Sequence, residues 1–143
     1  MQKIIIMILL MLIINNYALA SELVNMDTIQ YIESSRNINA YNKNSQARGL
    51  FQITPIVLKE YNQLNKTNYG LQSLFNGNIN YKIAKWYLEC RIPQLLKYYK
   101  KEIKVKNIIW AYNAGIGNVI KNRLPKETKE YLLKYKKFNL GKI

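Results

Sequence analysis

The spacing of apolar residues constrains the fold most, because they recur mainly every three to four positions and show no convincing strand alternation. This spacing predicts helices over about 27–35, 54–61, 80–91, 95–102, 105–113 and 125–138. The polar stretch 36–48 has no period and predicts a loop, and the only strand pairing considered is a small hairpin within 36–51. We therefore expect a compact, mainly α domain with a small irregular or hairpin region.

Several helix boundaries have recognisable signals. Asn25 or Asp27 can cap the first helix, and Thr54 followed by Pro55 predicts the start of the second. Pro93 is expected to end or restart the helix that begins at Asn80, and Gly115 to mark the end of the apolar helix before it.

The first twenty residues resemble an export signal. Lys3 precedes an unbroken apolar run from Ile4 to Ile14, and the small residues Ala18 and Ala20 predict cleavage after Ala20. The run is shorter than the roughly 20 residues that span a bilayer. We expect a signal peptide over 1–20, a single domain over 21–143, and a periplasmic or secreted protein.

Missing residue types exclude several chemistries. The chain has no histidine and one cysteine, Cys90, which rules out an internal disulfide, His/Cys zinc sites and His-dependent nucleophiles. Acid–base chemistry is left to a carboxylate, a tyrosine or a lysine. We expect no metal and no cofactor, and we interpret Cys90 as a small buried apolar residue.

Basic residues dominate, with a formal net charge of +14 for the whole chain. Most of them lie in the segment 97–143, which predicts attraction to a polyanion. An anionic cell wall or membrane surface is the favoured partner, and nucleic acid is not expected because no binding motif is present. A compositional bias that also enriches Asn and Ile explains the basicity equally well, so membrane contact stays open.

Glu33 is the most conspicuous carboxylate, because it closes an apolar helix and opens a polar loop beside Ser34. Two further motifs follow it, Gly49-Leu50-Phe51-Gln52 and Ala111-Tyr112-Asn113-Ala114-Gly115. With these motifs the sequence resembles the soluble lytic transglycosylases and goose-type lysozymes (SLT domain), which are peptidoglycan muramidases. Asn80 with the residues after it resembles a buried helix of that family, and Thr128 with Tyr131 resembles its closing Thr-x-x-Tyr element.

The sequence also departs from the family pattern. Gln52 follows Glu33 by one residue more than the family spacing, and Phe51 replaces a methionine. Gln46 and Ala84 stand where glycines are usual. The additional residue bears directly on the geometry of the loop around Glu33.

The resemblance implies a lysozyme-like helical fold and assigns roles to individual residues. Glu33 would be the single acid and then base, and the substrate-binding candidates are Ser34, Gln52, Tyr112, Asn113 and Tyr131. Each candidate also has a purely structural interpretation as a cap, a core ring or a loop contact. Asp27 lies about 240° around an ideal helix from Glu33, and the remaining glutamates are expected on solvated faces, which favours a single-carboxylate mechanism.

These observations predict an exported lytic transglycosylase that cleaves the MurNAc-GlcNAc β-1,4 bond of peptidoglycan glycan strands with formation of 1,6-anhydro-MurNAc ends. A hydrolytic muramidase of the same fold and a non-catalytic, basic wall-binding protein are the alternatives. We expect a monomer. By analogy with small single-domain relatives, a secretion or conjugation apparatus is a candidate partner, although the sequence names none.

Overall fold

The computed structural model describes residues 24–140, and within that range it is built from helices and isolated β-bridges. The bridges join Tyr41 to Arg48 and Arg48 to Ile53, so the irregular region contains paired residues but no strand among the described residues. The expected mainly α class is confirmed. The predicted signal peptide, residues 1–20, lies outside the described residues.

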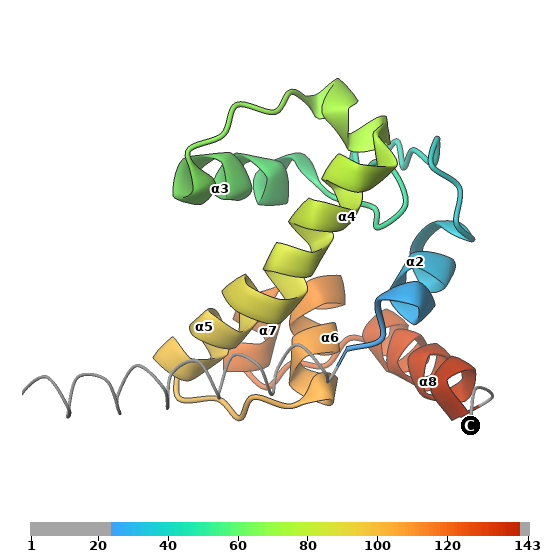
Figure 1. Cartoon of the computed structure of the whole chain (residues 1–143). Helices are drawn as coiled ribbons and strands as arrows, with labels where there is room; N and C mark the ends of the chain where they lie inside the picture. The colour runs from blue at the N-terminus through green and yellow to red at the C-terminus, as the bar shows by residue number, and fades with distance from the viewer. Residues whose placement is uncertain (1–23, 141–143) are drawn as a thin grey trace, which may run out of the picture.

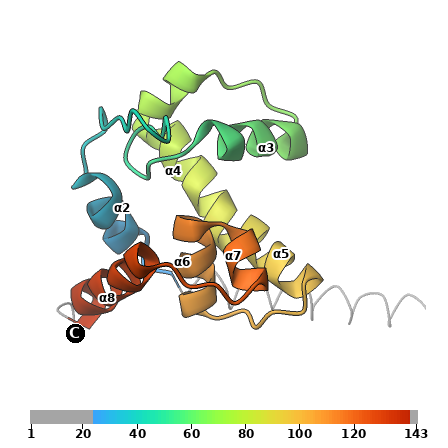
Figure 2. The same cartoon turned by 180° about the vertical axis from the view of Figure 1, so that it is seen from behind.

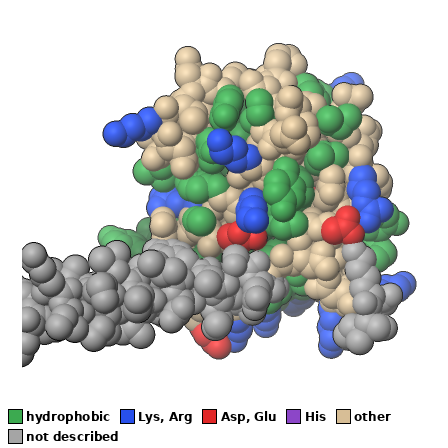
Figure 3. Space-filling view, in the orientation of Figure 1, with side chains coloured by type: hydrophobic (Ala, Val, Ile, Leu, Met, Phe, Trp, Pro, Cys, Tyr) green, Lys and Arg blue, Asp and Glu red, His purple; other side chains and the backbone are tan. Residues whose placement is uncertain are grey.

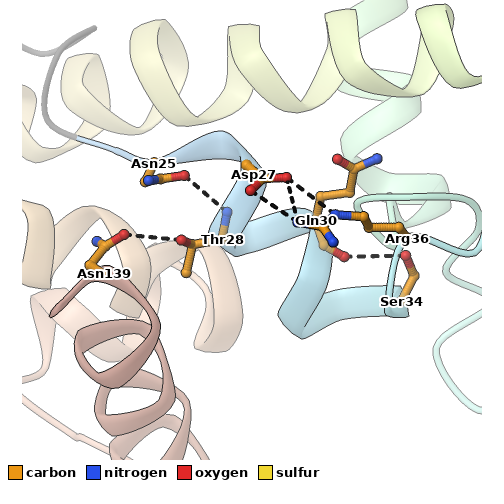
Figure 4. Close-up of polar contacts among 7 residues, drawn as sticks. All are labelled: Asn25, Asp27, Thr28, Gln30, Ser34, Arg36 and Asn139. Atoms are coloured by element: carbon orange, nitrogen blue, oxygen red, sulfur yellow. Dashed lines mark hydrogen bonds and ion pairs between the residues drawn. The ribbon is translucent and has the colours of Figure 1, made fainter. Parts of the chain in front are cut away.

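Two helices begin where the sequence signals predicted. Helix α2 (Met26–Ser34) is capped by Asn25, whose side-chain oxygen accepts a 3.0 Å hydrogen bond from the Thr28 N–H (Figure 4). Helix α3 (Pro55–Asn65) is capped by Thr54 and runs a turn beyond its predicted end. The short 3₁₀ helix η1 (Leu71–Phe75) follows in the stretch between the helices predicted over 54–61 and 80–91.

A long helical rod crosses the molecule diagonally (Figure 1). It comprises α4 (Gly77–Trp86), the π-helical segment η2 (Tyr87–Arg91) and α5 (Ile92–Tyr98). Pro93 lies in the first turn of α5, where its missing N–H costs little, so the chain restarts there without a loop. The centre of the core is formed by fully buried apolar side chains of this rod: Ile83, Leu88, Ile92 and Leu96.

Three helices complete the fold: α6 (Val105–Ala114), α7 (Ile116–Ile120) and α8 (Lys126–Leu140). The short helix α7 was not predicted, because Gly115 and its neighbour Gly117 indicated only an end to α6. Helix α6 packs against both α5 and α8, and α2 packs against α8 (Figures 1 and 2).

Side-chain hydrogen bonds fix α2 against α8. The Thr28 hydroxyl donates to the Asn139 side-chain oxygen at 3.0 Å (Figure 4), and the Asn25 N–H donates to the Tyr135 hydroxyl at 2.7 Å. Both contacts join residues more than a hundred positions apart in the sequence. They place the C-terminal end of α2, which carries Glu33, beside the N-terminal half of α8.

Candidate active site

Glu33 lies in the last turn of α2, where the helix is stopped sharply. Ser35 adopts a left-handed conformation (φ 52°), and its N–H donates to the Tyr31 carbonyl at 2.9 Å. The half-buried Glu33 therefore ends its helix at the wall of a cleft of about 460 Å³. This volume lies within the range of small-molecule sites.

The cleft brings together four of the six predicted site residues. Glu33 comes from α2, Gln52 from the loop before α3, and Tyr112 and Asn113 from the end of α6. Tyr87 of η2 also lines it, with its ring centroid 6.0 Å from that of Tyr112. With Asn42 and Glu127, which also line it, the cleft combines two carboxyl groups, three amides and two aromatic rings, the mixture of polar and apolar groups that is typical of a ligand site.

Glu33 has one hydrogen-bond partner among the described side chains, Tyr131 of α8. The tyrosine hydroxyl donates to Glu33 Oε1 at 2.7 Å. Burial raises the pKa of Glu33 from 4.5 to about 7, the Tyr131 hydrogen bond opposes this rise, and the negative charge of Glu127 adds to it. Near neutral pH the carboxyl group is therefore divided between its protonated and charged forms, as a group that both donates and accepts a proton requires.

Helix α8 also fixes the neighbouring wall of the cleft. The Thr128 hydroxyl, which is buried, donates to the Asn113 side-chain oxygen at 2.7 Å. Burial and the nearby Glu33 raise the pKa of Tyr131 far above its usual value, so this residue stays a hydrogen-bond donor. Thr128 and Tyr131, one turn apart, therefore hold Asn113 and Glu33 respectively.

The Gly49-Leu50-Phe51-Gln52 turn is held by Asn80, which is fully buried. The Asn80 side-chain oxygen accepts from the Phe51 N–H at 2.8 Å, and its amide group donates to the carbonyls of Arg48 and Leu74, both at 2.9 Å. Gly49 has a φ of +76°, and a Cβ at this position would overlap the Leu74 carbonyl and Asn80. The glycine is required by the backbone and by its close neighbours.

Gln52 and Tyr112 contact backbone of the same turn. Gln52 has a φ of 49°, and its side-chain amide donates to the carbonyls of Ala40 and Gly49 at 3.2 and 3.1 Å. The Tyr112 hydroxyl donates to the Phe51 carbonyl at 2.6 Å, and burial raises its pKa well above the usual value. Both residues line the cleft, while contact with substrate stays a prediction.

Ser34 and Tyr131 are placed differently from the other candidates, because neither belongs to the lining of the cleft among the described residues. The Ser34 hydroxyl donates to the Leu50 carbonyl at 2.8 Å and approaches the Gln30 carbonyl at 3.3 Å (Figure 4). These contacts attach the end of α2 to the Gly49–Gln52 turn. The hydrogen bonds of Ser34 and Tyr131 position the end of α2 and the Glu33 carboxyl group. Contact of either residue with substrate stays a prediction.

The expectation that the other glutamates occupy solvated helix faces was wrong in two cases. Glu89 is buried, and Glu60 is half-buried and bound to Arg91 at 2.6 Å. Glu127 is exposed, as expected, but it lines the cleft. Sequence reasoning therefore missed Glu127 as a cleft residue. Its position directly before Thr128 was the available signal, but the direction of a side chain in a first helical turn depends on how the helix packs.

Two other expectations concern Asp27 and Cys90. Asp27 does not line the cleft and is bound by the Arg36 guanidinium at 2.9 and 3.0 Å (Figure 4), consistent with the predicted separation from Glu33. Cys90 is half-buried, less enclosed than predicted.

The described residues contain no cluster of three or more side chains that could hold a metal ion. Within residues 24–140, no helix is long and apolar enough to cross a membrane.

A family model described as the transglycosylase SLT domain matches residues 13–134. The chain belongs to the transglycosylase SLT family. Membership confirms the resemblance carried by the Glu33, Gln52 and Tyr112 motifs, and it supports a peptidoglycan lytic transglycosylase type of activity directed at the cell wall, outside the cytoplasm. The match begins inside the predicted signal peptide, so the domain boundary at residue 21 stays a prediction. Searches of curated proteins and of solved structures gave no match.

Proposed function

We propose that this protein is an exported lytic transglycosylase that cleaves the MurNAc-GlcNAc β-1,4 bond of peptidoglycan and leaves 1,6-anhydro-MurNAc ends. The observation that carries the proposal is the Glu33 carboxyl group, which faces a 460 Å³ cleft and has a pKa raised to about 7. A carboxylic acid that keeps its proton near neutrality can protonate a glycosidic oxygen.

In the first step Glu33 acts as the acid. Its Oε1 accepts the Tyr131 hydrogen bond, which leaves Oε2 to carry the acidic proton into the cleft. Transfer of that proton to the glycosidic oxygen breaks the bond to C1 of MurNAc, and the GlcNAc-side hydroxyl leaves. Positive charge then develops at C1 and the sugar ring oxygen, next to the newly formed Glu33 carboxylate.

In the second step the Glu33 carboxylate acts as the base. It removes the proton from the C6 hydroxyl of the same MurNAc, whose oxygen attacks C1 and closes the 1,6-anhydro ring. Glu33 regains its proton, and no water is consumed. The pKa raised by burial serves both steps. A carboxyl group whose pKa is near 7 gives up and regains a proton near neutral pH with little difference in free energy.

The direct test replaces Glu33 with Gln, which keeps the shape and loses the transferable proton. We expect release of soluble fragments from purified sacculi to fall about 10³-fold, within the range found for general acid–base groups. Glu130→Gln, an exposed glutamate of the same chain outside the cleft, is the matched control and should retain activity. Near wild-type turnover by the Glu33 variant would exclude this mechanism.

A hydrolytic muramidase is the second candidate, and the observation that favours it is Glu127. Two carboxylates that share a cleft suit a mechanism in which one activates water, and Glu127 is the second cleft carboxylate among the described residues. Mass spectrometry of the products separates the two, because an anhydro end is lighter than a reducing end by one water. Reducing ends that disappear in Glu127→Gln would assign the hydrolytic reaction.

A further inference from the structure

A second concavity of about 550 Å³ lies between α6 and α8, away from the cleft. Its floor is apolar, and Leu133 at its edge is 67% exposed. The apolar side chains that line it are Val105, Ile109, Leu124, Leu132 and Leu133. We call it the α6–α8 groove. Exposed apolar patches that are rimmed by polar residues mark interaction sites for proteins, membranes or ligands.

Three exposed lysines surround the α6–α8 groove: Lys106 of α6, and Lys129 and Lys136 of α8. Lys129 and Lys136 are seven residues apart and therefore lie on the same side of α8. No aspartate or glutamate lines the groove, and none of the three lysines forms an ion pair within the described residues. Figure 3 shows lysine and arginine side chains along the lower edge of the molecule, the side on which α8 lies in Figure 1.

We propose that the α6–α8 groove docks the protein on an anionic lipid bilayer. The apolar floor and Leu133 would contact acyl chains, while the lysines would contact the phosphates of the lipid headgroups. This pairing of an apolar channel with a cationic rim is complementary to an anionic amphiphile. A second copy of the chain is a poor occupant, because an isologous contact would bring lysine rims together on molecules that each carry +14.

Docking through this groove has a geometric consequence for the cleft. Helix α8 carries two of the three groove lysines, Lys129 and Lys136, and also Tyr131, which binds Glu33. A lipid surface bound to the groove would therefore hold the cleft at a fixed orientation and a short distance from the bilayer. Docking itself needs no glycan cleavage, so it can be measured without the reaction.

The first experiment measures co-sedimentation of the full chain with phosphatidylglycerol-containing vesicles and with phosphatidylcholine vesicles. We expect binding only to the anionic vesicles, and at least about a 20-fold weakening in Lys129→Glu/Lys136→Glu, since each lysine near such a surface contributes roughly fivefold. The matched control is Lys59→Glu/Lys82→Glu, which changes the net charge equally on exposed residues outside the groove. An equal loss in both double variants would overturn the proposal.

The second experiment follows the contact locally. In a Cys90→Ala background, an environment-sensitive fluorophore is attached through Leu133→Cys or through Leu64→Cys, an exposed leucine of α3. We expect a blue shift with anionic vesicles at 133 and none at 64. Equal shifts, or no shift at 133, would contradict lipid docking. A dimer in sedimentation equilibrium that Leu133→Asp dissociates would instead assign the groove to a second copy, and binding of an acidic peptide without vesicle binding would assign it to a protein.

Discussion

The two walls of the cleft use polar side chains in opposite ways. In the turn wall, which is the Gly49–Gln52 turn with the buried Asn80 behind it, Gln52 lines the cleft and the Asn80 amide makes three hydrogen bonds to backbone groups. In the acid wall, Glu33, Asn113 and Glu127 line the cleft, and Thr128 and Tyr131 of α8 bind Asn113 and Glu33. Glu33 there has a single side-chain hydrogen bond and a pKa raised to about 7. The first wall is stabilised by its polar groups, whereas the second keeps one carboxyl incompletely satisfied and therefore reactive.

Asn80→Ala should give the largest effect on stability, because it removes three hydrogen bonds at once, to the Phe51 N–H and to the Arg48 and Leu74 carbonyls. The Arg48 carbonyl keeps its bond from the Ile53 N–H, whereas the other two groups lose this partner in a buried site. We expect the free energy of unfolding to fall by about 3–5 kcal/mol. Urea unfolding monitored by circular dichroism measures it. The control is Asn78→Ala, at an exposed position of α4 two residues earlier. It should lower the free energy of unfolding by less than about 1 kcal/mol. Similar losses in the two variants would remove the distinction between the walls.

At alkaline pH, Glu33→Gln should stabilise the protein, whereas Asn80→Ala should destabilise it. The carboxyl titrates near 4.5 when unfolded and near 7 when folded, so the folded state binds more protons between these values. The contribution of Glu33 to stability is therefore full below pH 4.5 and decreases as pH rises to about 7. We expect the free energy of unfolding of Glu33→Gln to exceed that of the wild type by about 2–3 kcal/mol at pH 8 and to equal it at pH 4. A constant difference across pH would contradict a raised Glu33 pKa.

Tyr131→Phe tests the hydrogen bond within the acid wall. The hydroxyl stabilises the charged form of Glu33, so its loss should raise the Glu33 pKa further, by roughly one unit. The alkaline limb of the pH dependence of kcat/KM should move upward by the same amount. Tyr135 accepts a hydrogen bond of the same length from the Asn25 N–H and makes none with Glu33, so Tyr135→Phe should leave that limb in place. A merely structural role for Tyr131 would lower the rate at all pH values without moving the limb.

The sequence predicted much of this arrangement where local chemistry decides the structure. The Asn25 and Thr54 caps place the starts of α2 and α3, and the three motifs identify Glu33, Gln52 and Tyr112 as residues that meet in one cleft. The π-helical passage into α5 was not predictable, because periodicity alone does not show how a helix accommodates one additional residue before Pro93.

The contacts that tune the site were harder to predict because they join distant segments. Ser34 reaches the Leu50 carbonyl, and Tyr131 reaches Glu33 across 98 positions. Spacing along α8 places Thr128 and Tyr131 on one face, yet only the packing of α8 against α2 and α6 determines what that face meets. The same packing places the exposed Glu127 at the cleft, which its position in the sequence did not reveal.

Glu127→Gln should give the smallest effect and the finest test of the acid wall. Glu127 is exposed, and its charge is the weakest of the three influences on the Glu33 pKa, so the neutral variant should lower that pKa by only about a few tenths of a unit. The alkaline limb should move downward, opposite to the shift expected for Tyr131→Phe. Because an exposed charge is screened, the shift should shrink as ionic strength rises toward 1 M. Glu130→Gln removes the same charge from α8 outside the cleft and should give no shift. A shift that salt leaves unchanged would show that Glu127 acts on Glu33 through bonded contacts rather than through its charge.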